Sequence, residues 1–257
     1  NMTIRPKCPR CGQKPKSHGA SWECAKCGKS WKKEYLAPVG RLRKQEIIKL
    51  SKNFCKHGVP YLNHYDCFLK ESPDLERVGI IDIEASNLKA DFGIMLCYAI
   101  YDLKSGKVLQ NAISKKDLYQ KGVLDKNLVK KCIDDMGKFT KLIGYYSGDY
   151  RFDIPFIRTR AVSLGVEFPG YGEQIHQDIY SLIKKKFCLS RNRLENASRT
   201  LVGMTRKTYN SRHWLFALQG NPDSLKFILD HCVRDVQDLG DLYLKVEKFA
   251  PDCRSLM

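Results

Sequence analysis

The chain has 257 residues, with 45 lysines and arginines against 28 aspartates and glutamates, and a net charge of +17. This length is enough for one sizeable hydrophobic core and a small accessory module. No stretch has the length and apolarity of a membrane span and no secretory signal opens the sequence. We therefore expect no membrane partner and an intracellular location, either cytoplasmic or in a nucleoid or nucleus.

The positive charge is concentrated near the N-terminus. Residues 1–56 hold fifteen lysines and arginines against three acids, a net charge of +12, which leaves only +5 for the rest of the chain. A basic head on a nearly balanced body favours a polyanionic partner, most simply nucleic acid. The alternative is a surface that only keeps the protein in solution.

Two cysteine pairs lie in a first region of about residues 3–35. They are Cys8-Pro-Arg-Cys11-Gly and Cys24-Ala-Lys-Cys27-Gly. In each pair two thiolates converge on one metal, and the glycine permits a turn that aims backbone N–H groups at sulfur. Together the pairs predict a four-thiolate zinc site, and the region resembles a zinc ribbon. Such a fragment has too little core to fold alone, so zinc would stabilise it. The sequence leaves open whether it also binds nucleic acid or a protein.

A second region, about 36–72, begins with a basic amphipathic segment, 41–54, and continues with a Cys-x-His and a His-x-x-Cys pair. The four candidate ligands are Cys55, His57, His64 and Cys67. They can close a second tetrahedral zinc site, which would be structural because four protein ligands leave no open position. The alternative is a chance grouping. The eleven cysteines, an odd number, favour reduced thiols and zinc over a disulfide framework.

The third region, 73–257, alternates predicted strands and helices. The expected strands are 78–86, 93–101, 108–114, 142–146 and 174–179. The expected helices are 127–139, 155–164, 182–187, 194–202 and 222–249. This order predicts an α/β domain with a mixed sheet flanked by helices.

The apolar segment 78–86 carries two acids, Asp82 and Glu84, two positions apart. Alternate side chains of a strand share a face, so both carboxylates point the same way. Two neighbouring charges inside a sheet are costly unless a cation holds them together, and oxygen ligands favour Mg²⁺ or Mn²⁺ over zinc. The alternative is that Asp82 ends the strand and Glu84 faces solvent.

Two further acids stand out by their position. Asp153 lies beside Pro155, which suits the first turn of a helix, and so Asp153 is expected near the N-cap at a ligand-binding edge of the sheet. Asp149 competes for the same role. Asp235 lies four residues after His231 on a periodic helix, so the two share a helix face, either in a metal site or towards solvent.

The order of these motifs, a strand with D-x-E, then F-D-x-P-F-I-R-x-R over 152–160, then a late helical H-x-x-x-D, resembles the DEDD (DnaQ-like) 3′→5′ exonuclease superfamily, which has a ribonuclease H-like fold. The resemblance covers roughly 76–248. The stretches His176-Gln-Asp178 and 194–201 are similar to the strand and helix that the family has between its second and third motifs.

The resemblance implies roles for these residues. Asp82, Glu84 and Asp235 would hold one Mg²⁺ or Mn²⁺ ion, and Asp82 would bridge to a second, supported by Asp153. Two ions about 4 Å apart activate a water and stabilise the leaving oxygen at phosphorus, which releases nucleoside 5′-monophosphates. The family has one subtype with histidine five residues before the last aspartate and another with tyrosine four before. His231, at four, would orient the water.

The resemblance also implies the substrate class, a nucleic acid with single strands or 3′ ends favoured. Two alternatives remain, an endonuclease using the same chemistry and a catalytically inactive, zinc-containing nucleic-acid-binding protein. Neither the choice between DNA and RNA nor the oligomeric state follows from the sequence.

Overall fold

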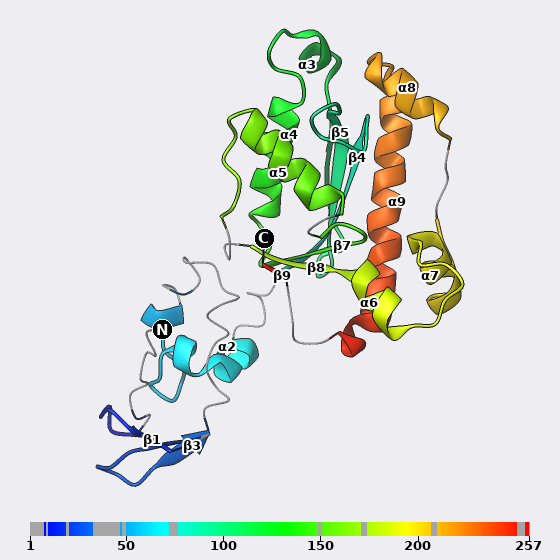
Figure 1. The fold of residues 1–257 in the computed structure, drawn as a ribbon. Coiled ribbons are helices and arrows are strands. Elements are labelled where there is room, and N and C mark those ends of the chain that lie inside the picture. Colours follow the sequence, from blue (N-terminus) through cyan, green and yellow to red (C-terminus); the bar gives the residue numbers. More distant parts are fainter. Residues whose placement is uncertain are drawn as a thin grey trace. The chain divides into compact units, whose positions relative to one another are not determined.

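The computed structural model describes residues 8, 10–18, 21–32, 47, 50–71, 77–148, 151–170, 174–206, 210–250 and 255–256. The chain divides into two compact units, 1–75 and 76–257 (Figure 1). The predicted division of the first unit into two modules, at about residue 35, stays a prediction. In the described part of the chain, none of the helices has both the length and the apolarity needed to cross a bilayer.

The described residues of the first unit form only short regular elements. Three short strands, β1 (Lys16–His18), β2 (Ser21–Glu23) and β3 (Ser30–Lys32), form an antiparallel sheet in that order. The 3₁₀ helix η3 (Tyr61–Asn63) and helix α2 (Tyr65–Glu71) follow. Most of the basic segment 41–54 lies outside the described residues, although its Leu50 is buried against Leu62 in a small apolar cluster.

The second unit is built on a mixed sheet. Its strands are β4 (Val78–Ala85), β5 (Met95–Asp102), β6 (Val108–Ala112), β7 (Lys141–Gly144), β8 (Ile175–Asp178) and the two-residue β9 (Ser255–Leu256). The spatial order is β6-β5-β4-β7-β8-β9. Strand β4 pairs antiparallel with β5 and parallel with β7, and β8 continues the parallel set, so β4 lies centrally. The five predicted strands are present, and the short β9 was not foreseen.

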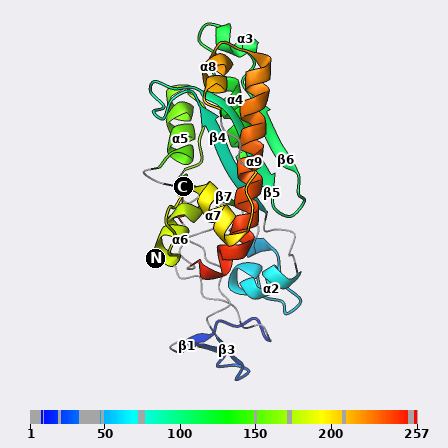
Figure 2. The same cartoon turned by 90° about the vertical axis from the view of Figure 1, so that its right-hand side faces the viewer.

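Helices cover both faces of this sheet. They are α3 (Lys115–Tyr119), α4 (Lys126–Met136), α5 (Asp153–Ser163), α6 (Ile179–Lys186), α7 (Leu194–Leu201), α8 (Arg212–Leu218), α9 (Pro222–Val246) and the 3₁₀ helix η5 (Glu247–Phe249). Helices α4 and α5 lie on one face and α9 on the other (Figures 1 and 2). The mixed α/β fold expected from the sequence is confirmed; α3 and α8 were not predicted.

The core between the sheet and α9 determines how closely the helix approaches the strands. Strands β4 and β5 bury nearly continuous apolar runs, and Cys232, Val236 and Leu239 of α9 are buried against them. At Gly240, a Cβ atom would lie 2.9 Å from the ring of Tyr101 on β5. Glycine therefore permits a close approach that any larger residue would prevent. This approach brings the polar residues of α9 towards β4.

Candidate functional site

Strand β4 places Asp82 and Glu84 on one face of the sheet. The strand continues to Ala85, so Asp82 does not end it. The neighbouring Ile81 and Ile83 alternate with the two acids along the strand and are buried on the opposite face. The side chain of Glu84 is only 17% exposed. Both carboxylates therefore lie within the protein body, and the alternative of a solvent-facing Glu84 is wrong.

Asp153 reaches the same strand from helix α5. It is the first residue of the helix, with Phe152 at the N-cap, and it is buried. Its Oδ1 accepts a hydrogen bond of 3.1 Å from the backbone N–H of Ile83, the residue between the two strand acids. The first turn of α5 is thus joined to β4 at the acids. The competing Asp149 lies outside the described residues.

Helix α9 brings His231 and Asp235 to the acids from the other direction. His231 Nε2 lies 3.5 Å from Glu84 Oε1 and 3.8 Å from Asp235 Oδ2. Both side chains are buried, with His231 only 3% exposed. Cys232, the next residue, donates from Sγ to the backbone oxygen of Asp82 at 3.3 Å. The face of α9 that His231 and Asp235 share therefore points into the site and not towards solvent.

The electrostatics of the cluster favour a cation. Burial raises the pKa of Glu84 well above its ordinary value, and the charges of Asp82 and Asp235 raise it further. Burial and the charge of Asp82 likewise raise the pKa of Asp153. A bound divalent cation would offset this repulsion, and an oxygen donor set suits Mg²⁺ or Mn²⁺. The residues present therefore fit such ions.

A pocket of about 750 Å³ opens beside the acids. Its lining comprises Asp82, Asp235, Tyr145, Tyr146, Tyr180, Asn192, Arg193, Leu194 and Glu195. The rings of Tyr146 and Tyr180 are 4.9 Å apart and nearly perpendicular, and the Arg151 guanidinium lies over both, at 4.6 and 4.8 Å. Carboxylates, aromatic rings and cationic groups thus lie in and around one cavity.

Strand β8 supports the loop that carries these tyrosines. Asp178 Oδ1 accepts the backbone N–H groups of Tyr146, at 2.9 Å, and of Tyr180, at 3.0 Å. Buried His176 contacts Ser147 Oγ through Nε2 at 3.0 Å, and burial lowers its pKa to about 3. Tyr146 has φ of +61°, a conformation that is costly for a bulky residue and so requires firm support.

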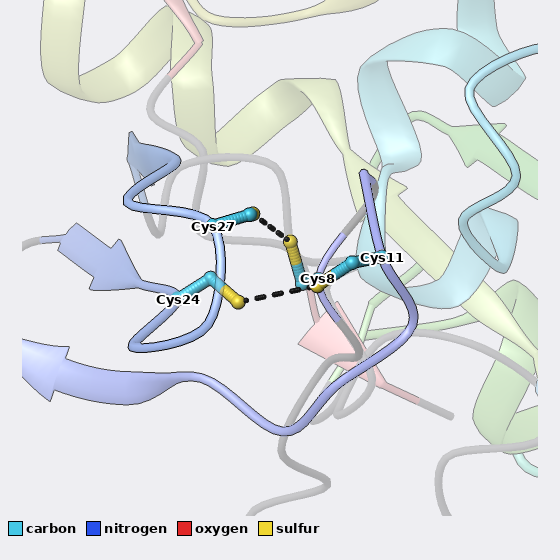
Figure 3. Close-up of side chains that lie close together, drawn as sticks. All are labelled: Cys8, Cys11, Cys24 and Cys27. Atoms are coloured by element: carbon cyan, nitrogen blue, oxygen red, sulfur yellow. Dashed lines mark hydrogen bonds between the residues drawn. The ribbon is translucent and has the colours of Figure 1, made fainter.

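The first cysteine set is brought together in the first unit, as Figure 3 shows. Its four sulfur atoms all lie within 4.8 Å of one another, so the set can hold a metal ion. Cys8 Sγ lies 3.5 Å from Cys27 Sγ, and Cys11 Sγ lies 3.4 Å from Cys24 Sγ. Burial opposes ionisation of Cys24, but hydrogen bonds from the Cys27 backbone N–H and the Cys11 thiol lower its pKa to about 6.

The glycines of both pairs adopt the expected turn. Gly12 and Gly28 have φ of +71° and +67°, and each donates its N–H to the carbonyl of the first cysteine of its pair. These distances, 2.9 Å to Cys8 and 2.8 Å to Cys24, close the two turns. The conformation is one that glycine adopts without steric cost.

The second Cys/His set is also assembled. Its four ligand atoms meet the same 4.8 Å spacing. Cys55 Sγ lies 3.2 Å from His64 Nδ1, and Cys67 Sγ lies 3.3 Å from His57 Nδ1. Among the described residues, only these two Cys/His sets reach that spacing. The described acids of the second unit do not form a group that meets this spacing.

The sequence reading missed three residues of this region. Neither Tyr146 nor Tyr180 was assigned a role from the sequence, and Trp214 lies on the unpredicted α8. Trp214 Nε1 donates to Glu84 Oε2 at 3.0 Å. An aromatic pair at 145 and 146, just before the F-D-x-P motif, was the only available signal.

Comparison with known proteins identifies the superfamily of the second unit. A model of the RNase H superfamily matches residues 80–246, which hold the acids from β4 to α9. A search of curated proteins gave no match. An RNase H-like domain indicates a nuclease-type hydrolase with a nucleic-acid substrate, and such nucleases usually use divalent metal ions. This match covers more than half of the chain, and the mixed sheet agrees with the fold: the chain belongs to the RNase H superfamily.

Proposed function

We propose that the protein is a 3′→5′ exonuclease of the DEDD group that hydrolyses phosphodiester bonds and releases nucleoside 5′-monophosphates. The main support is the meeting of Asp82, Glu84, Asp153 and Asp235 from three elements, with His231 between two of them. The raised pKa values of Glu84 and Asp153 also support bound cations, because burial and neighbouring charges disfavour the ionised carboxylates unless a cation is present. Without cations, a site of ionised carboxylates would also repel an anionic phosphodiester.

The resemblance to the DEDD group implies how the acids divide between two ions. Asp82, Glu84 and Asp235 would hold one Mg²⁺ or Mn²⁺ ion, and Asp82 and Asp153 a second. Such ions lower the pKa of a water and neutralise charge on the phosphate oxygens. His231 Nε2, which faces Glu84 and Asp235, orients the attacking water and accepts its proton.

The pocket beside the acids supports a strand end as the substrate. Aromatic rings stack on bases of any sequence, and cationic side chains neutralise phosphates. The pocket shared by Asp82, Tyr146 and Arg193 offers both beside the acids. A single unpaired nucleotide can enter such a pocket, whereas a base held within a duplex must first be unstacked. We therefore expect single-stranded 3′ ends to be preferred.

The first unit would hold two structural zinc ions, one in a zinc ribbon and one in the second Cys/His set. Its thiols and imidazoles provide two four-ligand sets of the donor types that zinc binds. The excess of basic residues in 1–56 supports a role in binding nucleic acid. Such binding weakens steeply as salt rises from about 50 to 200 mM.

The test is a gel time course with 5′-labelled single-stranded DNA and RNA in Mg²⁺ or Mn²⁺. Wild type should give a ladder that shortens from the 3′ end, and EDTA, Asp82→Ala and Asp235→Asn should each abolish it. Asp230→Asn is the matched control, because Asp230 is an exposed acid on the same helix. It should cleave like wild type.

Two other results would contradict the proposal. Discrete internal products that require Asp82 would show an endonuclease. Absence of metal-dependent cleavage of single strands and duplexes would leave a zinc-containing nucleic-acid-binding protein on a nuclease fold.

A further inference from the structure

Helix α8 brings a tryptophan against a candidate metal ligand. Trp214 Nε1 donates a hydrogen bond of 3.0 Å to Glu84 Oε2. The Trp214 ring also meets the imidazole of His231 edge-on, with centroids 5.4 Å apart and planes at 82°. One side chain therefore contacts two residues of the proposed active site without belonging to the carboxylate set.

Several contacts hold α8 in place. The ring of His213 stacks on Phe227 of α9, with centroids 4.0 Å apart and planes at 19°. Its Nδ1 lies 3.1 Å from Ser224 Oγ, also on α9. At the other end of the helix, Tyr119 Oη donates to the carbonyl of Gln219 at 3.0 Å. The position of Trp214 is thus set by its helix and not by the indole alone.

The hydrogen bond distinguishes the two oxygens of Glu84. Oε2 accepts the indole N–H, while Oε1 faces His231 Nε2 at 3.5 Å, on the side where His231 also approaches Asp235. A glutamate side chain has three rotatable bonds, and fixing them in the unbound protein removes an entropic cost from ion binding.

We infer that Trp214 is a positioning residue that orients the Glu84 carboxylate so that Oε1 is presented to the divalent ion. This inference rests on the proposed function. Hydrogen-bond partners of metal ligands typically contribute about 10- to 100-fold to metal affinity or activity. Simple packing of the indole would contribute to stability but not to ion affinity.

The test measures Mn²⁺ binding by calorimetry and by tryptophan fluorescence. Trp214→Phe keeps an aromatic ring but removes the N–H donor. Benzothienylalanine at position 214 replaces only the N–H by sulfur and keeps the ring size, which separates loss of the donor from loss of packing. Leu215→Ala is the matched control, since Leu215 is on the same helix and 66% exposed.

We expect Mn²⁺ affinity to fall about 10-fold or more in both donor-free variants and to stay at the wild-type value in Leu215→Ala. Mn²⁺ should also change the fluorescence of the wild type but not that of Trp214→Phe. Equal Mn²⁺ affinity in the wild type and both variants would overturn the inference and leave the proposed exonuclease intact. Failure of the wild type itself to bind Mn²⁺ would overturn the proposed function and this inference with it.

Discussion

The two units use polar ligand groups in opposite ways. In the first unit the Cys and His side chains form two sets of four, and the ligand atoms of each set lie within 4.8 Å of one another. The described apolar clusters of this unit are small. In the second unit a large apolar core fills the space between sheet and helices, and the acids lie at its edge, where they raise one another's pKa values. Among the described residues of the first unit, candidate ligands (Cys8, Cys24, Cys55 and Cys67) are a large share of the few buried side chains, whereas the acids of the second unit lie beside a separate apolar core.

A difference in metal dependence follows. A unit whose ligands make up its core needs the ion in order to fold. A unit with an independent core folds without the ion and needs it only for chemistry. Variants of each unit test this difference in metal dependence.

The largest effect is expected from Cys24→Ser. The buried Cys24 thiol is one of four candidate zinc ligands, and structural zinc sites with four protein ligands contribute about 10–16 kcal/mol of apparent binding energy. We expect loss of one zinc ion per chain by elemental analysis and rapid proteolysis within residues 8–32. Hydrolysis of a short strand should persist. An intact, protease-resistant first unit in this variant would show that the unit folds without this metal site, and would contradict the expected difference between the units.

His231→Gln should have the next largest effect. Loss of a general base typically lowers the rate by about 10²- to 10⁴-fold, and kcat should fall while Mn²⁺ binding persists. His231→Tyr should recover part of the rate, because one subtype of the resembling family has tyrosine at this spacing. A decrease of less than tenfold, beside an inactive Asp235→Asn, would show that His231 does not act as the base.

Tyr146→Ala should weaken substrate binding by about 1–3 kcal/mol, the usual contribution of one stacked base. Steady-state kinetics should show a raised KM with a smaller change in kcat. Tyr146→Phe keeps the ring and should behave like wild type. An unchanged KM in Tyr146→Ala would exclude stacking at this position.

The effect that is smallest at neutral pH concerns His176, whose pKa burial lowers to about 3. Below about pH 6.5 the unfolded chain binds a proton at this histidine that the folded protein does not bind, so the free energy of unfolding decreases as the pH falls from 6.5 towards 3. The slope is at most about 1.4 kcal/mol per pH unit. The free energy of unfolding, measured by urea titration at several pH values, should depend less steeply on pH in His176→Gln than in the wild type. An equal pH dependence in the two proteins would contradict the lowered pKa of His176.

The sequence predicted the scaffold well because the relevant signals are local. Three elements are indicated without tertiary information. Strand β4 is indicated by its run of Val and Ile, α5 by Pro155 in its first turn, and α9 by its long stretch of helical periodicity. The placement of Asp82, Glu84, Asp153, His231 and Asp235 together followed from a family resemblance, and periodicity alone left the faces of Glu84 and Asp235 undecided. Helix α8 was missed because seven residues give too short a pattern.

The tertiary partners were beyond reach for a different reason. Trp214 and Glu84 are 130 positions apart, and the hydrogen bond between them depends on how α8 packs on α9. The pocket likewise joins residues from β4, the 145–148 loop, α6 and α9. No spacing rule along the chain connects such positions.

The distribution of the acids also sets when during synthesis the protein can act. Asp82 and Glu84 leave the ribosome early, Asp153 later, and His231 and Asp235 only when α9 has been made. A growing chain that lacks α9 has three of the four acids but lacks Asp235 and His231. On the proposed mechanism, hydrolysis therefore begins only once the chain has been made through α9 and that helix has docked onto the sheet.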